Sequence, residues 1–229
     1  MNKNNNIGWQ VFNSNYDNNW EEIIQSLKSS NIFQTSNWAN FKLQNGWSSE
    51  KYIFVDDRGK VNYALQALNK TYFKIFKIYW IPGGIASDKS SEKQLNINIV
   101  KFIDNFSQNN FLQYLRINLL QDKNDEFKID KKYFSKSKVN INSGFTIHIN
   151  INKDSEEILG QMKKKHRYYV KKSLKENVNW IFNSNKKYIL DFLDCYNNMI
   201  LEKKIKLINL SKEDLILLKN NLKDKMQII

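Results

Sequence analysis

Lysine and arginine side chains gather on one side of a predicted helix over residues 154–175, where their chemistry suits the binding of phosphate groups. At about 100° per residue, the cations that share this face are Lys163, Lys164, Arg167, Lys171 and Lys175. The opposite face carries the residues Ile158, Leu159, Met162, His166, Tyr169 and Val170. We therefore expect one side of the helix to pack against the protein and the other to meet either an anion or water.

The start of this basic helix and the element after it are also indicated by the sequence. Asp154 is a suitable N-cap, and Glu157, three residues later, can complete a capping box. Acidic residues near the start and lysines further along suit the helix dipole. Residues 178–182 are apolar enough to predict a strand after the helix.

The whole chain is basic. Its 229 residues carry a formal net charge of +13, and the isoelectric point is near 9.5. This charge predicts anionic partners, such as RNA, a nucleotide-linked substrate or an acidic membrane surface. A lysine-rich solvated surface is the alternative, and the abundance of Asn, Lys and Ile also indicates a compositional bias of the source genome.

Nucleophilic and metal-binding residue types are scarce in the chain. Cys195 is the only cysteine, which excludes an internal disulfide and a cysteine cluster for a metal. We interpret Cys195 as a packed thiol, and His148 and His166 as structural residues, because no partner motif accompanies them. The sequence predicts no metal and no cofactor, and it assigns no catalytic residue.

Targeting signals are equally scarce. The N-terminal residues lack a long apolar segment, and no run of about 18 apolar residues occurs anywhere in the chain. We therefore expect a cytoplasmic protein, with peripheral membrane contact left open.

Hydrophobic periodicity predicts a chain that mixes helices and strands. Helices are expected at 18–29, from Thr35 or Ser36 to Lys42, at 90–108, at 186–203 and at 211–223, the last capped by Ser211. Strands are expected at 51–55, 61–68, 76–81, 111–117 and 145–151. The sequence Asp56-Asp57-Arg58-Gly59 predicts a hairpin turn, and the only proline ends a strand in Pro82-Gly83-Gly84.

The order of these elements resembles an α/β (α+β) GNAT-like acyltransferase fold that begins a second time at residue 145. The predicted domains are a nearly complete one over 1–144 and the start of another over 145–229. Residues 226–229 look like the first part of a strand, which normally needs about five or six residues. We therefore expect the chain to break off inside a second, truncated domain.

Three segments make the resemblance narrower. NIFQTSNWANFKLQNGW at 31–47, KIYWIPGG at 77–84 and MKKKHRYYVKKSLKENVNW at 162–180 are similar to segments of the Fem family. Members of that family are aminoacyl-tRNA-dependent transferases that build peptidoglycan bridges. They pair two GNAT-like domains in one chain, and the similarity extends from about residue 30 to the end.

The resemblance implies roles for particular residues. Lys42 matches a family lysine that contacts the phosphates of a nucleotide- or lipid-linked muropeptide, while spacing alone also allows a solvated lysine at a helix end. Pro82, Gly83 and Gly84 are expected beside the same cleft with Trp38 and Tyr79, with backbone N–H groups able to approach an anion. We interpret Trp38 and Trp47 as packing residues. The five cations of the basic helix become candidate contacts for tRNA phosphates.

This chain departs from the family pattern in two places. Residues 201–215 contain no arginine where family members commonly have one, and only Lys204 or Lys206 can substitute as point charges. Asn177 occupies the place of a glycine before the strand, and asparagine tolerates the same left-handed backbone.

The resulting hypothesis is an aminoacyltransferase in which a muropeptide amine attacks the ester of an aminoacyl-tRNA. One alternative uses an acyl-CoA donor to modify a cell-surface polysaccharide, although IPGGIASD at 81–88 is a poor match to a CoA-binding turn. A second alternative is a basic module without catalysis that binds RNA or a membrane.

Overall fold

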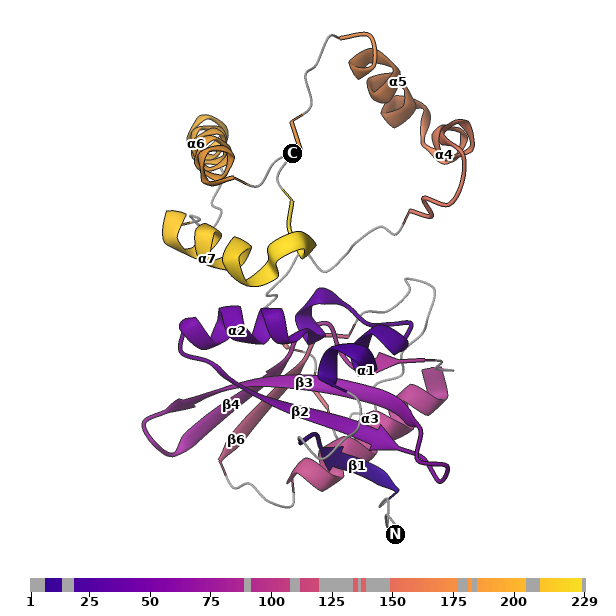
Figure 1. Ribbon diagram of the computed structural model, residues 1–229, viewed down its shortest axis with the longest axis vertical. Coiled ribbons are helices and arrows are strands. Elements are labelled where there is room, and N and C mark those ends of the chain that lie inside the picture. The colour runs from indigo at the N-terminus through magenta and orange to yellow at the C-terminus, as the bar shows by residue number, and fades with distance from the viewer. Residues whose placement is uncertain are drawn as a thin grey trace.

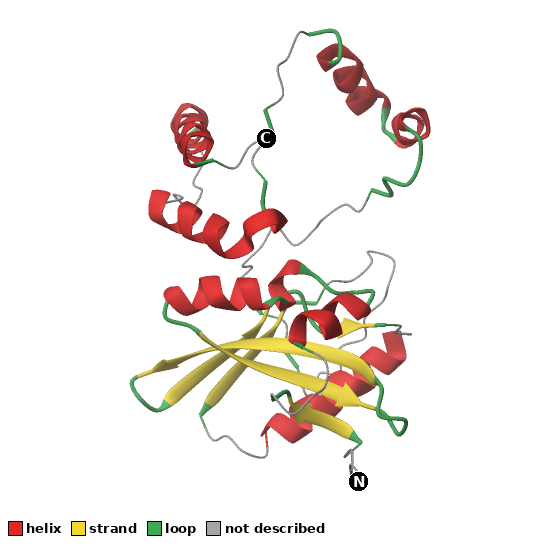
Figure 2. Ribbon diagram, in the orientation of Figure 1, coloured by secondary structure: helices red, strands yellow, loops and turns green. Residues whose placement is uncertain are grey.

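The protein combines a mixed β-sheet with helices on both of its faces, and the predicted α+β class is confirmed (Figure 2). The computed structural model describes residues 7–13, 19–88, 92–107, 112–119, 134–135, 137–138, 149–176, 181–182, 185–204 and 211–227. The arrangement is consistent with a GNAT-like domain. The predicted domain boundary at residue 144 remains a prediction.

The described strands form one six-stranded sheet. The main path runs β1 (Gly8–Val11), β2 (Ser48–Val55), β3 (Val61–Tyr72), β4 (Phe76–Ile81) and β6 (Gln113–Ile117), and the short β5 (Ala86–Ser87) pairs with β3. All pairs are antiparallel except β4 with β6, which is parallel. The parallel pair places the C-terminal ends of β4 and β6 side by side, where loops that carry functional residues commonly leave a sheet.

The turn between β2 and β3 forms as its sequence predicts. Asp56 Oδ1 accepts hydrogen bonds from the backbone N–H groups of Arg58 and Lys60, at 3.0 and 2.8 Å. Gly59 has a φ of 77°, a conformation that glycine adopts without steric penalty.

Helices α1 (Trp20–Ser26) and α2 (Ser36–Gln44), with the 3-10 helix η1 (Ile32–Gln34) between them, cover one face of the sheet (Figure 1). Asn19 and Glu22 form a capping box at the start of α1, and Thr35 caps α2 through Trp38 N–H. The core on this face contains Trp20, Ile23, Ile24 and Leu27 of α1 packed against Ile53, Val55, Ala64 and Ala86.

Helix α3 (Glu92–Ser107) covers the opposite face of the sheet. Phe102 and Phe106 of α3 contact aromatic rings of the strands, among them Tyr52 and Tyr79. Because side chains of a strand alternate between faces, neighbouring residues of β4 enter different environments.

The C-terminal part contains α4 (Ser155–Gln161), α5 (Lys164–Ser173), α6 (Lys186–Lys203), α7 (Lys212–Leu222) and the 3-10 helix η2 (Lys223–Lys225). Helix α7 lies beside α2, as Figure 1 shows. Asn37 Nδ2 donates to the backbone oxygen of Asn221 at 2.6 Å, and Lys225 forms an ion pair with Glu21 at 3.2 Å. These contacts join the C-terminal helices to the layer above the sheet.

The single basic helix predicted over 154–175 is wrong. Met162 and Lys163 both have extended backbone, with ψ of 146° at each, and they separate α4 from α5. No residue of α4 or α5 is buried, so the predicted packed face is also wrong. Most of the stability of a helix in a protein comes from packing of its apolar face, which α4 and α5 lack, and Gly160 weakens the helix further. The N-cap is confirmed, because Asp154 accepts from Glu157 N–H at 2.7 Å.

Three predicted strands fall largely outside the described residues. Of the strand at 145–151 only 149–151 are described, and of the strand at 178–182 only 181–182; neither piece is in a strand. Residues 226 and 227 are likewise described without strand structure, and 228–229 lie outside the description.

Candidate functional site

Lys42, near the C-terminal end of α2, lies among aromatic rings. Its Nζ is 5.1 Å from the ring centroid of Trp38, 5.1 Å from that of Phe41 and 5.7 Å from that of Trp80. Trp38 and Phe41 come from α2 itself, whereas Trp80 lies near the end of β4 in the sheet. The faces of aromatic rings attract a cation, so these contacts hold the ammonium in place.

The ammonium of Lys42 is half-buried. Burial lowers its pKa from the ordinary lysine value, while the negative charge of Asp214 on α7 acts in the opposite direction. Among the described residues, no carboxylate lies within ion-pair distance of Lys42. A partly desolvated cation without an ion-pair partner is suited to an anionic ligand, because electrostatic attraction is stronger where water is displaced.

A second hydrogen-bond donor lies beside Lys42. The indole Nε1 of Trp38 is buried and has no acceptor among the described residues. The indole of Trp80, by contrast, donates to Asn118 Oδ1 at 2.7 Å, just after β6. Trp47 contacts Trp80 with ring centroids 5.9 Å apart. The predicted packing role of Trp38 and Trp47 therefore coexists with one donor that remains unsatisfied.

The turn at Pro82, Gly83 and Gly84 is held by side chains from η1 and its flanks. Gln34 Nε2 donates to the backbone oxygen of Pro82 at 2.8 Å, and Asn31 Nδ2 donates to that of Gly83 at 3.1 Å. Gly83 has a φ of 72°, and a Cβ there would clash with the side-chain amide of Asn31. Both the backbone conformation and the close approach therefore require glycine. Anion binding by the N–H groups of this turn stays a prediction.

Gln34 and Gln66 form the buried polar link beneath this turn. Gln34 Oε1 accepts from the backbone N–H of Gln66 at 2.5 Å, and Gln66 Nε2 donates to the backbone oxygens of Phe33 and Thr35. Both side chains are fully buried. Sequence reasoning missed this pair. The available signal was Gln66 itself, a polar residue that lies between the apolar pairs Ala64-Leu65 and Ala67-Leu68 of its strand.

Tyr79 does not join Trp38 and Lys42, because it lies on the opposite face of the sheet. Its ring contacts Phe106 of α3 at 4.6 Å, and its hydroxyl donates to Glu50 Oε1 at 3.2 Å. Its neighbour Trp80 lies on the α2 face. Of the residues expected to line one cleft, the structure thus brings Lys42 and Trp38 together and places Tyr79 elsewhere.

Glu50 is the centre of a second polar cluster, which the sequence did not indicate. Its carboxylate accepts from Tyr52 Oη at 2.6 Å, Asn69 Nδ2 at 3.1 Å and Lys77 Nζ at 2.9 Å, in addition to Tyr79. Burial raises the pKa of Glu50, but the donated hydrogen bonds and the charge of Lys77 outweigh it and leave the pKa below the ordinary value. Burial and the adjacent carboxylate raise the pKa of Tyr52. Glu50 therefore remains ionised and joins three strands.

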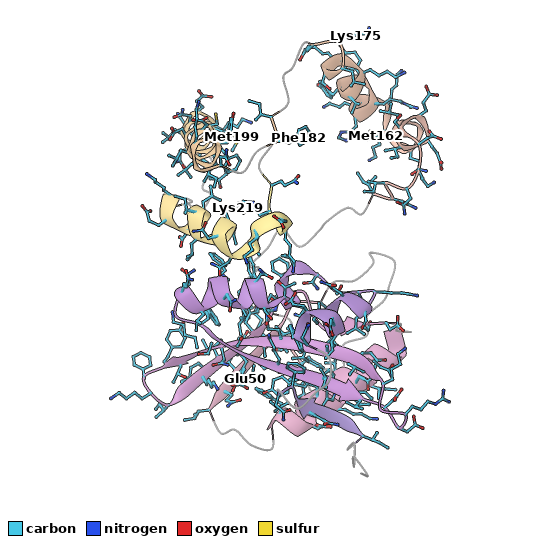
Figure 3. All side chains as sticks on the ribbon, viewed as in Figure 1. Glu50, Met162, Lys175, Phe182, Met199 and Lys219 are labelled. Atoms are coloured by element: carbon cyan, nitrogen blue, oxygen red, sulfur yellow. The ribbon has the colours of Figure 1, made fainter. Side chains whose placement is uncertain are left out.

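The five cations predicted to contact tRNA lie on and beside α5, away from the sheet (Figure 1). Lys163, Lys164, Lys171 and Lys175 are exposed and Arg167 is half-buried. Figure 3 shows Lys175 beyond α5, away from the sheet that holds Glu50. Tyr168 and Tyr169, at 62% and 54% exposure, accompany these cations on α5. Solvent access to the lysines is thus confirmed, and their role toward tRNA stays a prediction.

Three further sequence predictions concern metal ligands, Cys195 and the membrane. None of their His, Cys, Asp and Glu side chains forms a group that could hold a metal ion. Cys195, predicted to be packed, is instead exposed on α6. None of the helices that the structure describes has the length and apolar composition to cross a bilayer. The Lys42 site consists of one ammonium, the aromatic rings around it, and the indole N–H of Trp38, which has no acceptor among the described residues.

Comparison with known proteins shows a likeness in fold. No protein-family model and no curated protein matches the sequence. Among solved structures, the fold is similar to that in the crystal structure of FemX, with a TM-score of 0.64 and 15% sequence identity. The match covers 96% of this chain and 56% of FemX, so the chain spans about half the length of that protein. This likeness confirms the predicted resemblance to the Fem family at the level of the fold.

Proposed function

We propose that the protein is an aminoacyltransferase that joins an amino acid from aminoacyl-tRNA to the amine of a nucleotide- or lipid-linked muropeptide. The FemX-like fold supports this class of reaction, and the Lys42 site supports an acceptor that carries phosphate. A place in the cytoplasm belongs to the same proposal, because charged tRNA is found there.

The half-buried ammonium of Lys42 is the observation that carries the proposal. It is held by aromatic rings rather than by a carboxylate, so binding of a diphosphate does not first require an ion pair to break. Trp38, whose ring centroid lies 5.1 Å from this ammonium, carries a buried indole N–H that has no acceptor among the described residues. A charge-assisted contact of this kind contributes about 1.5–3 kcal/mol.

The reaction needs positioning more than covalent catalysis. The acceptor amine attacks the ester carbonyl of the aminoacyl-tRNA, an amide bond forms, and the ester C–O bond breaks. The terminal hydroxyl of the tRNA leaves with the proton that the amine loses. Because the tRNA ester is already activated, holding the reactants in contact and stabilising the developing oxyanion supply the rate.

The cations beside α5 complete the proposal by contacting the tRNA. Arg167 and the lysines around it lie on a helix without buried residues, so their charge faces solvent. Lysine and arginine contacts to phosphate give affinity without sequence preference. These cations therefore do not select the donated amino acid, and that selection depends on contacts near the ester.

The test is a transfer assay with the purified protein, a pool of radiolabelled aminoacyl-tRNA and muropeptide acceptors. We expect label to move from the tRNA to the acceptor and the transfer to fall in Lys42→Met. Parallel reactions replace the tRNA by labelled acetyl-CoA and the muropeptide by a polysaccharide. Transfer only from acetyl-CoA would assign the alternative acyltransferase, and tRNA binding without any transfer would assign the non-catalytic module.

A further inference from the structure

The turn between β3 and β4 exposes large apolar side chains at one end of the sheet. Phe73 is 91% exposed and Ile75 is 70% exposed, and Tyr72 beside them is 38% exposed. Exposure of a nearly whole phenylalanine side chain to water is unfavourable relative to its burial. Figure 1 shows this turn projecting from the sheet beyond the end of α2.

The start of β6 extends the same apolar surface. Lys77 N–H donates to the backbone oxygen of Leu112 at 3.2 Å, which places the start of β6 beside the start of β4. Leu112 is 61% exposed and Tyr114 is 45% exposed. We call this surface the hairpin tip, and it consists of Tyr72, Phe73, Lys74, Ile75, Leu112 and Tyr114.

The backbone of the hairpin tip is strained in a way that its sequence does not favour. Phe73 and Lys74 have φ of 51° and 63°, and Leu112 has φ of 133°. Ile75 N–H donates to the oxygen of Tyr72 at 3.2 Å, which closes a tight turn around the two positive-φ residues. Such turns favour asparagine and glycine, because a larger side chain in the left-handed region brings its Cβ close to the following carbonyl oxygen. Both the exposed side chains and this turn are unfavourable for the isolated chain in water, so its stability does not account for them.

Charge distinguishes this surface from an ordinary hydrophobic patch. Residues 69–77 contain no acidic residue. Lys77 pairs with Glu50 of β2 at 2.9 Å, so the cations that belong to the tip are Lys70 and Lys74. The hairpin at the other end of β3 is different, because its turn consists of Asp56, Asp57, Arg58 and Gly59. Aromatic and aliphatic groups at a projecting tip, flanked by lysine, match the composition of a surface that enters the boundary between lipid headgroups and acyl chains.

We propose that the hairpin tip docks the protein on an anionic lipid bilayer. Phe73 and Ile75 enter the headgroup region, while Lys70 and Lys74 contact lipid phosphates. A second copy of the chain is a poorer occupant, because a two-fold axis at the tip would bring the same lysines together. The proposal rests on the hairpin alone and is tested without substrate, so it stands or falls independently of the proposed aminoacyl transfer.

The first test measures binding to vesicles by flotation. Wild-type protein is mixed with vesicles of phosphatidylcholine alone or with 30% phosphatidylglycerol, about the anionic share of a charged leaflet. We expect binding to the anionic vesicles, a loss of at least about tenfold in Phe73→Ser/Ile75→Ser, and about fivefold in Lys74→Gln. Ile7→Ser/Leu201→Ser is the matched control, because Ile7 and Leu201 are 68% and 74% exposed elsewhere.

Several outcomes overturn the proposal. The first is that the wild type does not float with anionic vesicles. The second is that the tip variant floats like the wild type. The third is that the control variant loses as much binding as the tip variant. Binding that disappears only in Lys164→Gln/Arg167→Gln/Lys171→Gln assigns membrane contact to α5 and also overturns it. The proposal is also overturned if the protein forms a dimer in vesicle-free solution, the tip substitutions abolish that dimer, and no vesicle binding is observed. Circular dichroism verifies that each variant is folded.

The second test locates the inserted segment directly. Cys195 is the only cysteine, so Cys195→Ser allows a single environment-sensitive dye to be attached at a chosen position. Thr71→Cys keeps every lysine and apolar side chain of the tip, and Asp57→Cys in the opposite hairpin is the matched control. We expect a blue shift on addition of anionic vesicles for the dye at position 71 and none at position 57. Equal shifts at both positions, or none at 71, contradict docking through the tip.

Discussion

At the scale of single residues, the protein places two charged side chains in opposite situations. Glu50 is satisfied by four donors, whereas Lys42 is held by aromatic rings without an ion-pair partner among the described residues. A carboxylate with so many donors stabilises the sheet. A partly buried cation without an ion-pair partner among the described residues is available for a ligand, and this difference separates the structural cluster from the candidate site.

Lys42→Met tests the candidate site. Methionine retains the apolar stem against Trp38 and Phe41, so the fold should survive with a change in unfolding free energy of less than about 1.5 kcal/mol. We expect the KM for the muropeptide acceptor to rise about 10- to 150-fold, which corresponds to a lost charge-assisted contact. Separate kinetics on acceptor and aminoacyl-tRNA provide the measurement. A defect confined to the tRNA side contradicts the assignment.

Glu50→Gln tests the polar cluster through pH. The pKa of Glu50 is lowered in the folded protein, so its contribution to stability is present above the unfolded value of about 4.3 and is lost as pH falls through the folded value. At pH 7 we expect the substitution to cost about 1–2 kcal/mol, allowing for partial exposure of the carboxylate. Urea unfolding at several pH values should show this difference shrinking below about pH 4.5.

The matched control for Glu50 is Glu202→Gln, which removes the same charge from an exposed residue of α6. Its unfolding free energy should stay within about 0.5 kcal/mol of the wild type at each pH. A Glu50→Gln difference that does not change with pH would show that the packing of the amide, rather than the charge, is responsible.

Gly83→Ala tests the turn that follows β4. The positive φ alone costs about 1–2 kcal/mol for alanine, and the contact with Asn31 adds to it. Thermal or urea unfolding measures the loss, and Gly160→Ala is the control because its Cβ meets nothing within 4 Å. In an Asn31→Ala background the cost of Gly83→Ala should decrease. An equal cost in both backgrounds would leave backbone strain as the only cause.

At the scale of elements, the basic segment shows how periodicity can mislead. Its apolar positions suit a packed face, yet α4 and α5 are separate and contain no buried residue. The cations consequently lie on a short exposed helix. The resulting surface is suited to phosphate contacts but derives little stability from the core.

The charge of α5 is tested by salt dependence of tRNA binding. Lys164→Gln/Arg167→Gln/Lys171→Gln should reduce the slope of log affinity against log salt by about 0.7–0.9 for each lost phosphate contact. The matched control, Lys187→Gln/Lys203→Gln/Lys212→Gln, removes the same charge from exposed positions on α6 and α7. An unchanged slope in the α5 variant, or an equal change in the control, would indicate a solvated face without a specific role.

At the scale of the whole molecule, α7 connects the two predicted domains. Its buried residues Leu215 and Leu222 and the Asn37–Asn221 hydrogen bond link it to the layer formed by α1 and α2. Asp214 at the start of α7 also acts on the charge of Lys42. The candidate site therefore depends on residues from both sides of the predicted boundary.

The predicted boundary is tested by expressing residues 1–144 alone. If they form a domain, this piece should unfold cooperatively, because the sheet and both of its core clusters lie within it. We expect a lower Tm than for the whole chain, since the contacts of α7 with α2 are removed. Circular dichroism during heating provides the measurement, and a gradual, non-cooperative loss of signal would contradict the boundary.

The elements that were predicted correctly are those that depend on neighbouring residues in the sequence. The hairpin at Asp56–Gly59, the strand at Phe76–Ile81, the caps at Thr35 and Ser211 and the long helix α6 all follow from turn chemistry, capping and hydrophobic period. The short strands β1 and β5 were not predicted, because two to four residues give too little periodicity and their pairing depends on β2 and β3.

Tertiary structure decided what the sequence left open. Lys42 was predicted from a resemblance, but its environment exists only because β4 brings Trp80 to α2 and α7 brings Asp214 near it. Tyr79 and Trp80 are adjacent in sequence yet serve opposite faces, because a strand alternates its side chains. The break between α4 and α5 was likewise not predicted. A helix in a protein is stabilised mainly by packing of its apolar face, and neither α4 nor α5 contains a buried residue.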